Sequence, residues 1–267
     1  MNQQSKVAVI GAGIMGEALI SALISSGVNP ELITISEKRA DRSAELIARY
    51  SIRQASLSIN VADADAVLLV VKPQDMSVVL EEIKESINPS TVVISFAAGK
   101  TISFISSVLG TNNPVVRVMP NTPTMVGAGM AAASMGTGVT EAQKKFVLGF
   151  LAATGKVIEV AEDLQDAVTA TSGSGPAYFF AFVEAMVAGA RDLGLSEEEA
   201  TILTIQTIVG AAKLLDESGK SATTLRENVT SPNGTTAAAL ASFGSSDLNS
   251  MVAKAMKAAS DRSQELA

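Results

Sequence analysis

Three regularly spaced glycines stand between an apolar run and a helical pattern near the start of the sequence. Gly11, Gly13 and Gly16 directly follow Val7–Ile10. Between a strand and a helix, the first glycine permits a tight turn, the second lets a pyrophosphate approach, and the third lets helix and strand pack closely. Free N–H groups at the helix start meet the phosphate charge. An ordinary glycine-rich turn is the alternative. The pattern predicts a dinucleotide site made of Ile10, Gly11, Ala12, Gly13, Ile14, Met15 and Gly16.

The segment Ser36–Arg39 ends the next expected strand and bears on the choice of dinucleotide. Glu37 would accept hydrogen bonds from both hydroxyls of the adenosine ribose and favour NADH. Ser36, Lys38 and Arg39 would instead hold a 2′-phosphate and favour NADPH. We expect Glu37 to point away from the ribose, so the predicted coenzyme is NADPH, with NADH as the alternative. Otherwise these charges only solvate the start of the next helix.

Three further segments lie at the ends of expected strands: Val71–Gln74, Ala97–Gly99 and Met119–Pro123, which includes Asn121. Each is rich in small residues, Pro or Gly, which suits a backbone that approaches a ligand. Taken singly, each would be an ordinary turn. Because ligands of open α/β sheets bind beyond the carboxyl ends of the strands, their recurrence predicts one shared crevice, with Asn121 at the coenzyme.

Two polar segments, both predicted to be loops, stand out in the otherwise apolar second part of the sequence. One is Ser172–Pro176 and the other is Asn228–Thr236, and each precedes a helical pattern. Hydroxyl groups and backbone N–H groups at a helix start can bind a carboxylate. Simple helix capping explains one such segment, but two together predict a cage for a small anion. We therefore place Ser172, Gly173, Ser174, Gly175, Thr235 and Thr236 at the substrate.

The elements that must position these segments follow from hydrophobic periodicity. Strands are expected at Val7–Ile10, Leu32–Ser36, Val67–Val71, Val92–Ser95 and Val115–Val118, extended by Ala128–Ala133 and Val157–Val160. Helices are expected at Met15–Ser25, Ala40–Tyr50, Met76–Ile87, Ile102–Leu109 and Glu141–Leu151. This alternation predicts an α/β fold with a doubly wound, Rossmann-type parallel sheet over residues 1–162.

The strand patterns stop after residue 163. Helices are expected there at Pro176–Leu193, Glu197–Asp216, Thr235–Phe243 and Leu248–Glu265, so residues 163–267 are predicted to form an all-α domain. The second of these helices is apolar on several faces and must be buried on several faces. We infer a dimerisation domain that packs against a second copy of itself. Burial against the chain's own α/β domain is the alternative.

Composition excludes several classes of function. Hydrophobic residues make up 47% of the 267 residues, which is enough for a large core. The net charge of -7 and the absence of Trp argue against nucleic-acid binding. The absence of Cys and His excludes thiol chemistry, Ser–His–Asp triads and zinc sites, so no metal is expected. Because no apolar stretch reaches the ~18 residues that a membrane helix needs, we expect no membrane association. The absence of Cys fits a cytoplasmic location, which we expect for this chain.

Six motifs in one order reveal a family resemblance. They are GAGIMG at 11–16, VKPQ at 71–74, AAG at 97–99, VRVMPNTP at 116–123, SGSGPAY at 172–178 and NVTSPNGTT at 228–236. Together they resemble Δ1-pyrroline-5-carboxylate reductase, over nearly the whole chain from about Ser5 to Glu265. The last two motifs in combination are much more specific than the glycine-rich loop. The family usually has Gly where this chain has Asn233, a residue that tolerates positive φ better than most.

The resemblance implies an NAD(P)H-dependent reduction of the C=N bond of 1-pyrroline-5-carboxylate to L-proline. It also implies interlocked homodimers, which in this family often assemble into decamers. By similarity, the coenzyme touches residues 10–16 together with Ser36, Val70, Val71, Lys72, Pro73, Ala97, Ala98, Gly99 and Asn228. Glu162, Thr235 and Thr236 lie at the substrate, with Thr236 as the catalytic candidate at the ring nitrogen or the carboxylate. Water or an already protonated substrate could equally supply the proton.

Two other functions compete with this interpretation. Hydroxy-acid dehydrogenases of the 3-hydroxyisobutyrate or 6-phosphogluconate type share the plan but resemble one another in using a lysine early in the helical domain. Residues 176–190 contain no Lys, and Lys213 lies far along the next helix. A non-catalytic NAD(P)-binding sensor would keep the dinucleotide loop without preserving the two polar segments, and both of these look intact.

Overall fold

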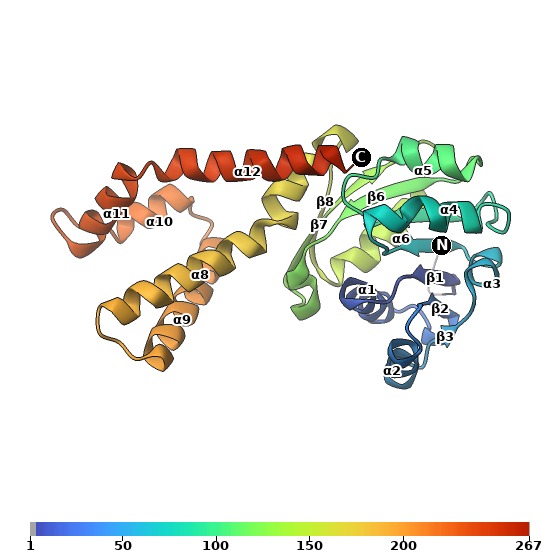
Figure 1. Ribbon diagram of the computed structural model, residues 1–267, viewed down its shortest axis with the longest axis horizontal. Coiled ribbons are helices and arrows are strands. Elements are labelled where there is room, and N and C mark those ends of the chain that lie inside the picture. Colours follow the sequence, from blue (N-terminus) through green and yellow to red (C-terminus); the bar gives the residue numbers. More distant parts are fainter. Residues whose placement is uncertain (1–3, 267) are drawn as a thin grey trace. The chain divides into compact units, whose positions relative to one another are not determined.

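The computed structural model describes residues 4–266, which fold into two compact units (Figure 1). The first, here called the sheet unit, comprises residues 4–174 together with residues 259–266. The second, the helical unit, comprises residues 175–258. In the described part of the chain, no helix is both long enough and apolar enough to span a membrane.

Within residues 4–266, eight strands form one sheet in the order β3-β2-β1-β4-β5-β6-β7-β8. The strands are β1 (Val7–Ile10), β2 (Ile33–Ser36), β3 (Arg53–Gln54), β4 (Ala66–Leu69), β5 (Val92–Ser95), β6 (Val115–Met119), β7 (Gly129–Met135) and β8 (Gly155–Glu159). Strands β1 to β6 are parallel, whereas β7 pairs antiparallel with β6 and parallel with β8. Residues 120–128 explain this reversal, because parallel neighbours need a crossover of about a dozen residues or more.

Helices cover both faces of the sheet. They are α1 (Ile14–Ser25), α2 (Ala40–Tyr50), α3 (Leu57–Ala62), α4 (Met76–Ile83), α5 (Ile102–Leu109), α6 (Glu141–Ala152) and α7 (Gln165–Val168). Residues of α1, α2 and α6 share one apolar core with Val7 and Val9 of β1. Residues of α3, α4 and α5 share the other core with Ala8 and Ile10. Alternate residues of β1 therefore enter opposite cores, which is why this strand is apolar throughout.

The helical unit contains α8 (Gly175–Asp192), α9 (Glu197–Glu217), α10 (Ala222–Asn228), α11 (Thr235–Ser245) and most of α12 (Leu248–Glu265). Helix α9 starts with a capping box in which Ser196 and Glu199 each accept from the other's backbone N–H. Phe182 of α8 and Phe243 of α11 stack at a tilt, with ring centroids 6.3 Å apart. Many large apolar side chains of this unit nevertheless remain exposed, among them Phe179, Phe180, Ile202, Leu203 and Val209.

The prediction of a loop at Ser172–Pro176 is wrong. Residues Thr169–Gly173 form a π-helical turn between α7 and α8, in which the N–H of Ser174 donates to the carbonyl of Thr169 at 2.8 Å. We attribute this π-helical turn to tertiary packing. Gly173 packs on Met119, where an added Cβ would lie 3.3 Å from Sδ, and a wide turn inserts a residue without ending the helix. Local Ser and Gly preferences are overridden by this packing.

Among the strands and α-helices of the described residues, four short ones were not expected from the sequence, namely β3, α3, α7 and α10. Several expected boundaries also shift by a few residues. Leu32 ends a 3-10 helix instead of starting β2, β4 ends at Leu69, and α4 ends at Ile83. These shifts leave the order of the elements as expected, with the glycine-rich loop between β1 and α1.

Candidate functional site

The carboxyl ends of β2, β1, β4 and β5 lie side by side, and backbone hydrogen bonds join them. The N–H of Gly11 donates to Ser36 O at 3.0 Å, and the N–H of Val70 donates to Ile10 O at 2.9 Å. Strand β1 lies between β2 and β4, so the order of the sheet reverses there. Such a switch point is where open α/β sheets bind ligands.

The three glycines of the loop differ in their surroundings. Gly11 has φ +87°, and a Cβ on it would lie 2.5 Å from Val70 O. A Cβ on Gly16 would lie 2.3 Å from Gly11 O, so this glycine lets α1 pack closely against the loop. Gly13, by contrast, is exposed and has no neighbour within 4 Å of an added Cβ. The open approach over Gly13 fits the passage of a pyrophosphate.

The start of α1 fits the same ligand. Gly13 is its N-cap and provides no side-chain hydrogen bond, so no side-chain cap competes for the first N–H groups of the helix. These groups carry the positive end of the helix dipole. Ala12 is buried, while Ile14 is 66% exposed beside the open glycine. The loop therefore offers a phosphate-binding backbone of the kind that the sequence predicted.

The end of β2 is arranged differently from our expectation. The Ser36 hydroxyl donates to Ala55 O at 3.0 Å and accepts from Asn60 Nδ2 at 2.9 Å. Glu37 turns toward the loop, because its Oε2 accepts from the N–H of Ala12 at 2.9 Å. Asn60 was left out of the predicted site, yet its amide fixes the end of β2. Lys38 and Arg39 are exposed.

The strand ends beyond β1 contribute Val70–Pro73, Ala97–Gly99 and Asn121. Lys72 is exposed and Pro73 opens a 3-10 helix. Gly99 has φ +74°, and an added Cβ would lie 2.7 Å from the Cβ of Leu266, which directly follows α12. Asn121 uses its Oδ1 to accept from Met130 N at 2.8 Å, which fixes the start of β7. At this part of the carboxyl edge of the sheet, packing of the backbone fixes the conformation of the strand ends.

Glu162 lies beside a buried arginine that the sequence analysis missed. Arg117 of β6 is 3% exposed, and its guanidinium lies 3.6 Å from Glu162 and 3.6 Å from Asp166. Glu162 Oε1 also accepts from the N–H of Ile102 at 2.7 Å, where α5 begins. Asp166 accepts from Ser263 Oγ of α12 at 2.6 Å. The cluster joins the segment after Ala97–Gly99 to the end of α12.

Four predicted residues belong to the helical unit. Gly175 starts α8, Asn228 ends α10, and Thr235 and Thr236 start α11. No side chain caps the N-terminus of α11, so its first N–H groups remain open to an anion. The turn before it depends on Asn233, which has φ +60° as its match to a family glycine suggested. Thr236 is half-buried.

A charged cluster borders the glycine-rich loop on its α2 side. Arg42 donates from Nε to Ala12 O at 3.1 Å and pairs with Glu17 and Glu45. Burial alone would raise the pKa of Glu17, but hydrogen bonds from Arg42 and Tyr50 outweigh it and hold that pKa below its ordinary value. Glu17 is therefore an anion at neutral pH and keeps Arg42 against the loop.

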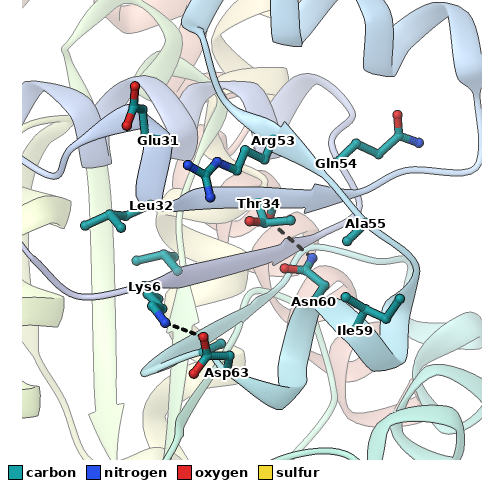
Figure 2. Close-up of a pocket in the computed structure, with 12 residues that line it drawn as sticks. Lys6, Glu31, Leu32, Thr34, Arg53, Gln54, Ala55, Ile59, Asn60 and Asp63 are labelled. Atoms are coloured by element: carbon teal, nitrogen blue, oxygen red, sulfur yellow. Dashed lines mark hydrogen bonds and ion pairs between the residues drawn. The ribbon is translucent and has the colours of Figure 1, made fainter.

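A separate hollow of about 300 Å³ lies toward the amino ends of β1, β2 and β3 (Figure 2). Its wall includes Lys6, which pairs with Asp63, and Asn60, which donates to Thr34 O at 3.2 Å. Ligands of this sheet type bind at the opposite, carboxyl edge. We therefore place the candidate site at the glycine-rich loop.

Comparisons with known sequences show which family the chain resembles. Residues 162–266 match the family described as Pyrroline-5-carboxylate reductase dimerisation, and residues 6–99 match that described as NADP oxidoreductase coenzyme F420-dependent. The pyrroline-5-carboxylate reductase of Corynebacterium melassecola is 41% identical over 264 residues, which cover 97% of this chain and 98% of that protein. That of Pseudomonas aeruginosa is 40% identical and covers 98% and 97%.

Solved structures give the same result. A pyrroline-5-carboxylate reductase from Coxiella burnetii superposes with a TM-score of 0.91, at 36% identity over 99% of both chains. The pyrroline carboxylate reductase of Plasmodium falciparum, solved with NADP bound, gives a TM-score of 0.88 at 28% identity and covers 100% of this chain and 99% of that one. Because the identity extends over nearly the full length, the chain belongs to the pyrroline-5-carboxylate reductase family.

Proposed function

We propose that this protein catalyses the NAD(P)H-dependent reduction of 1-pyrroline-5-carboxylate to L-proline, the last step of proline biosynthesis. The observation that carries the proposal is 41% identity to a named reductase over 97% of the chain. The open glycine-rich loop at the switch point of the sheet provides the physical support, because it can receive a dinucleotide. The reaction makes the chain an oxidoreductase acting on a C=N bond.

The coenzyme of this proposal is NADPH, with NADH as the alternative. NADPH is supported by the relative solved with NADP bound and by the match of residues 6–99 to an NADP oxidoreductase family. Residues 1–162 form the coenzyme domain, in which the pyrophosphate lies over Gly13 and the N-terminus of α1. Further coenzyme contacts come from Ser36, Lys38, Arg39, Val70–Pro73, Ala97–Gly99, Asn121 and Asn228.

The chemistry places few demands on acid–base groups. The reduced nicotinamide, when bound, supplies a hydride that forms the new C–H bond, the C=N π electrons move to nitrogen, and nitrogen takes up a proton. The protein must hold the imine carbon in position and grip the carboxylate, which is positioning work. A chain without His or Cys can do this with backbone amides and hydroxyl groups.

Residues 163–267 bind the substrate in this proposal. The carboxylate accepts from the open N–H groups and hydroxyls of Thr235 and Thr236 at the start of α11, an arrangement that helix termini favour. Thr236 is the catalytic candidate at the ring nitrogen or the carboxylate. Glu162 and residues Ser172, Gly173, Ser174 and Gly175 complete the predicted substrate set. Because Ser172 and Gly173 lie in the π-helical turn and Gly175 starts α8, a contact from these three residues comes from a helix surface instead of a loop.

The same residues also form the dimerisation domain. The match of residues 162–266 to a dimerisation family supports a homodimer. Phe179 is 64% exposed, Ile202 60% and Val209 54%, and such large apolar surfaces in one domain are covered in most stable proteins. A second copy is the occupant that we propose, with assembly into decamers as a further step and the cytoplasm as the location.

The test is an assay of purified protein with 1-pyrroline-5-carboxylate and either NADPH or NADH. Loss of the absorbance of the reduced nicotinamide, with L-proline identified as the product, is the expected result. If a folded protein that binds NADPH oxidises it with neither this imine nor other cyclic imines, the proposal is wrong.

A further inference from the structure

The loop that follows β5 packs against residues 263–266, here called the 263–266 turn, in which the N–H of Leu266 donates to Ser263 O at 3.2 Å. A Cβ added to Gly99 would lie 2.7 Å from Leu266 Cβ and 2.8 Å from both Leu266 C and Ser263 O. The loop and the turn belong to the same compact unit. The sequence analysis assigned the small size of Gly99 to the coenzyme, but the structure shows that the turn requires it too.

A buried hydrogen bond anchors the 263–266 turn. Ser263 is 2% exposed, and its hydroxyl donates to Asp166 Oδ1 at 2.6 Å. Bonds between a hydroxyl and an ionised carboxylate are short and roughly twice as strong as those between neutral groups. An Nη atom of Arg117 lies 3.6 Å from the same carboxylate oxygen and orients it from the other side. The turn is therefore held in one place on the loop.

The far end of the same loop is fixed by a second carboxylate. Glu162 Oε1 accepts from the N–H of Ile102 at 2.7 Å, where α5 begins. The other Nη atom of Arg117 lies 3.6 Å from this oxygen. Residues 97–102 are thus held at two points, and the two carboxylates responsible share one buried cation.

The position of this loop matters for the proposed reaction. With the adenosine at the end of β2 and the pyrophosphate over Gly13, the nicotinamide half of the coenzyme lies over the ends of β4 and β5. Ala97–Gly99 directly follow β5, and the backbone there can contact the ring. Hydride transfer needs reacting atoms about 3–3.5 Å apart, and a displacement of about 1 Å can cost about 100-fold in rate.

We propose that the 263–266 turn positions Ala97–Gly99 against the nicotinamide, with Ser263 as a positioning residue that acts through Asp166. The inference deepens the proposed function and rests on it for the identity of the reaction. Helix α12 begins in the helical unit, and its residues 259–265 belong to the sheet unit. One helix therefore connects the residues proposed for dimerisation with the turn that holds the coenzyme loop.

The experiment compares Ser263→Ala with Thr91→Val as the matched control. Thr91 is 1% exposed, and its hydroxyl donates to Ala64 O at 2.5 Å, at the opposite end of β5. Each variant loses one buried hydroxyl bond, but only the first lies at the coenzyme loop. In Ser263→Ala, kcat should fall about tenfold or more while the dissociation constant of NADPH changes less than about threefold, because the pyrophosphate contacts remain. Thr91→Val should keep the wild-type kcat.

A measurement without substrate tests the contact itself. Amide hydrogen exchange of residues 97–102 should be faster in Ser263→Ala than in the wild-type protein, and unchanged there in Thr91→Val. If the wild-type protein reduces no imine, the proposed function is wrong, and the exchange rates still decide whether the turn holds the loop.

Three results would overturn the inference. They are a wild-type kcat in Ser263→Ala, an equal fall of kcat in Ser263→Ala and Thr91→Val, and unchanged exchange of residues 97–102. A thermal melt checks the folding of each variant. Should Ser263→Ala fail to fold, Leu266→Gly takes its place, since Leu266 is only half-buried. Leu266→Gly removes the Cβ that lies on Gly99 and should lower kcat more than Leu266→Ala, which keeps it; equal effects would contradict the proposal.

Discussion

Replacing Gly13 by Ala should separate coenzyme binding from folding. A Cβ at this position meets no atom within 4 Å, and the backbone has φ -65° and ψ -160°, which alanine adopts. Loss of a glycine from the unfolded chain stabilises by about 0.4–1 kcal/mol, and loss of a preferred N-cap residue offsets part of this. The free energy of unfolding should therefore change by less than about 1 kcal/mol.

Coenzyme affinity should fall much more. The new methyl group would occupy the open approach over the loop and push the pyrophosphate away from the N–H groups of α1. Hydrogen bonds to a charged group are worth about 1.5–3 kcal/mol. Loss of one such bond corresponds to a rise in the dissociation constant of NADPH of about 10- to 150-fold. The two effects are measured by urea unfolding and by fluorescence titration.

Two other glycines provide the controls. Gly16→Ala places a Cβ 2.3 Å from Gly11 O, so the loop must shift, and stability should fall by about 1–3 kcal/mol together with affinity. Gly149→Ala, in an open position on α6, should raise stability by up to about 1 kcal/mol and leave affinity unchanged. Wild-type NADPH binding by Gly13→Ala would show that the pyrophosphate does not pass over Gly13. A loss of stability equal to that of Gly16→Ala would refute the open-space argument.

Three further perturbations test other parts of the site. Thr236→Ala should keep the dissociation constant of NADPH and lower kcat/KM about 10- to 100-fold through a lost substrate contact; unchanged steady-state kinetics would remove Thr236 from the site. Glu17→Gln should be less stable than wild type at pH 7. Because the pKa of Glu17 is lowered, this difference should persist above about pH 4.5 and vanish as the pH falls through the folded-state pKa, in urea unfolding at several pH values. Arg117→Met leaves Glu162 and Asp166 without their cation and should lower the free energy of unfolding by about 2–4 kcal/mol, measured with urea. Lys144→Gln, which breaks a surface pair, should lower it by less than about 1 kcal/mol. Equal losses would contradict the role of burial.

The sequence predicted helices and strands well where local and tertiary preferences agree. The bounds of Ala40–Tyr50 and Val92–Ser95 are confirmed to the residue. The first has a strongly amphipathic helical pattern, and the second is a short apolar run that enters both cores. The placement of the glycine-rich loop between a strand and a helix was predictable for the same reason.

Elements without a local signal were missed. Strand β3 is two residues long and exposed, so it has no apolar pattern. In Leu57–Ala62 the apolar residues alternate as in a strand, yet the segment is helical. The π-helical turn depends on the packing of Gly173 against Met119, which is distant in sequence. No local rule predicts such a contact.

In the candidate site too, features with a local sequence signal were predicted and features set by distant contacts were not. Glycine positions and strand ends follow from spacing, whereas the direction of Glu37 depends on the N–H of Ala12, which lies on another loop. A fingerprint with an acidic residue about 20 positions after the last glycine could have indicated this contact. The Arg117 cluster could not be predicted in this way, because an arginine within a strand is usually exposed to solvent.

The last turns of α12 have a consequence for folding during synthesis. Residues 259–266 pack into the sheet unit, where Ser263 binds Asp166 and Leu266 lies against Gly99. These contacts join segments that are far apart in the sequence, by 97 residues for Ser263 and Asp166, and such contacts raise the contact order of the sheet unit. On the ribosome, residues 4–174 can form the sheet early, but the contacts with residues 259–266 form only after those residues have been synthesised. An intermediate with an uncovered apolar edge should thus accompany every round of synthesis, and chaperone dependence should be greatest at that stage.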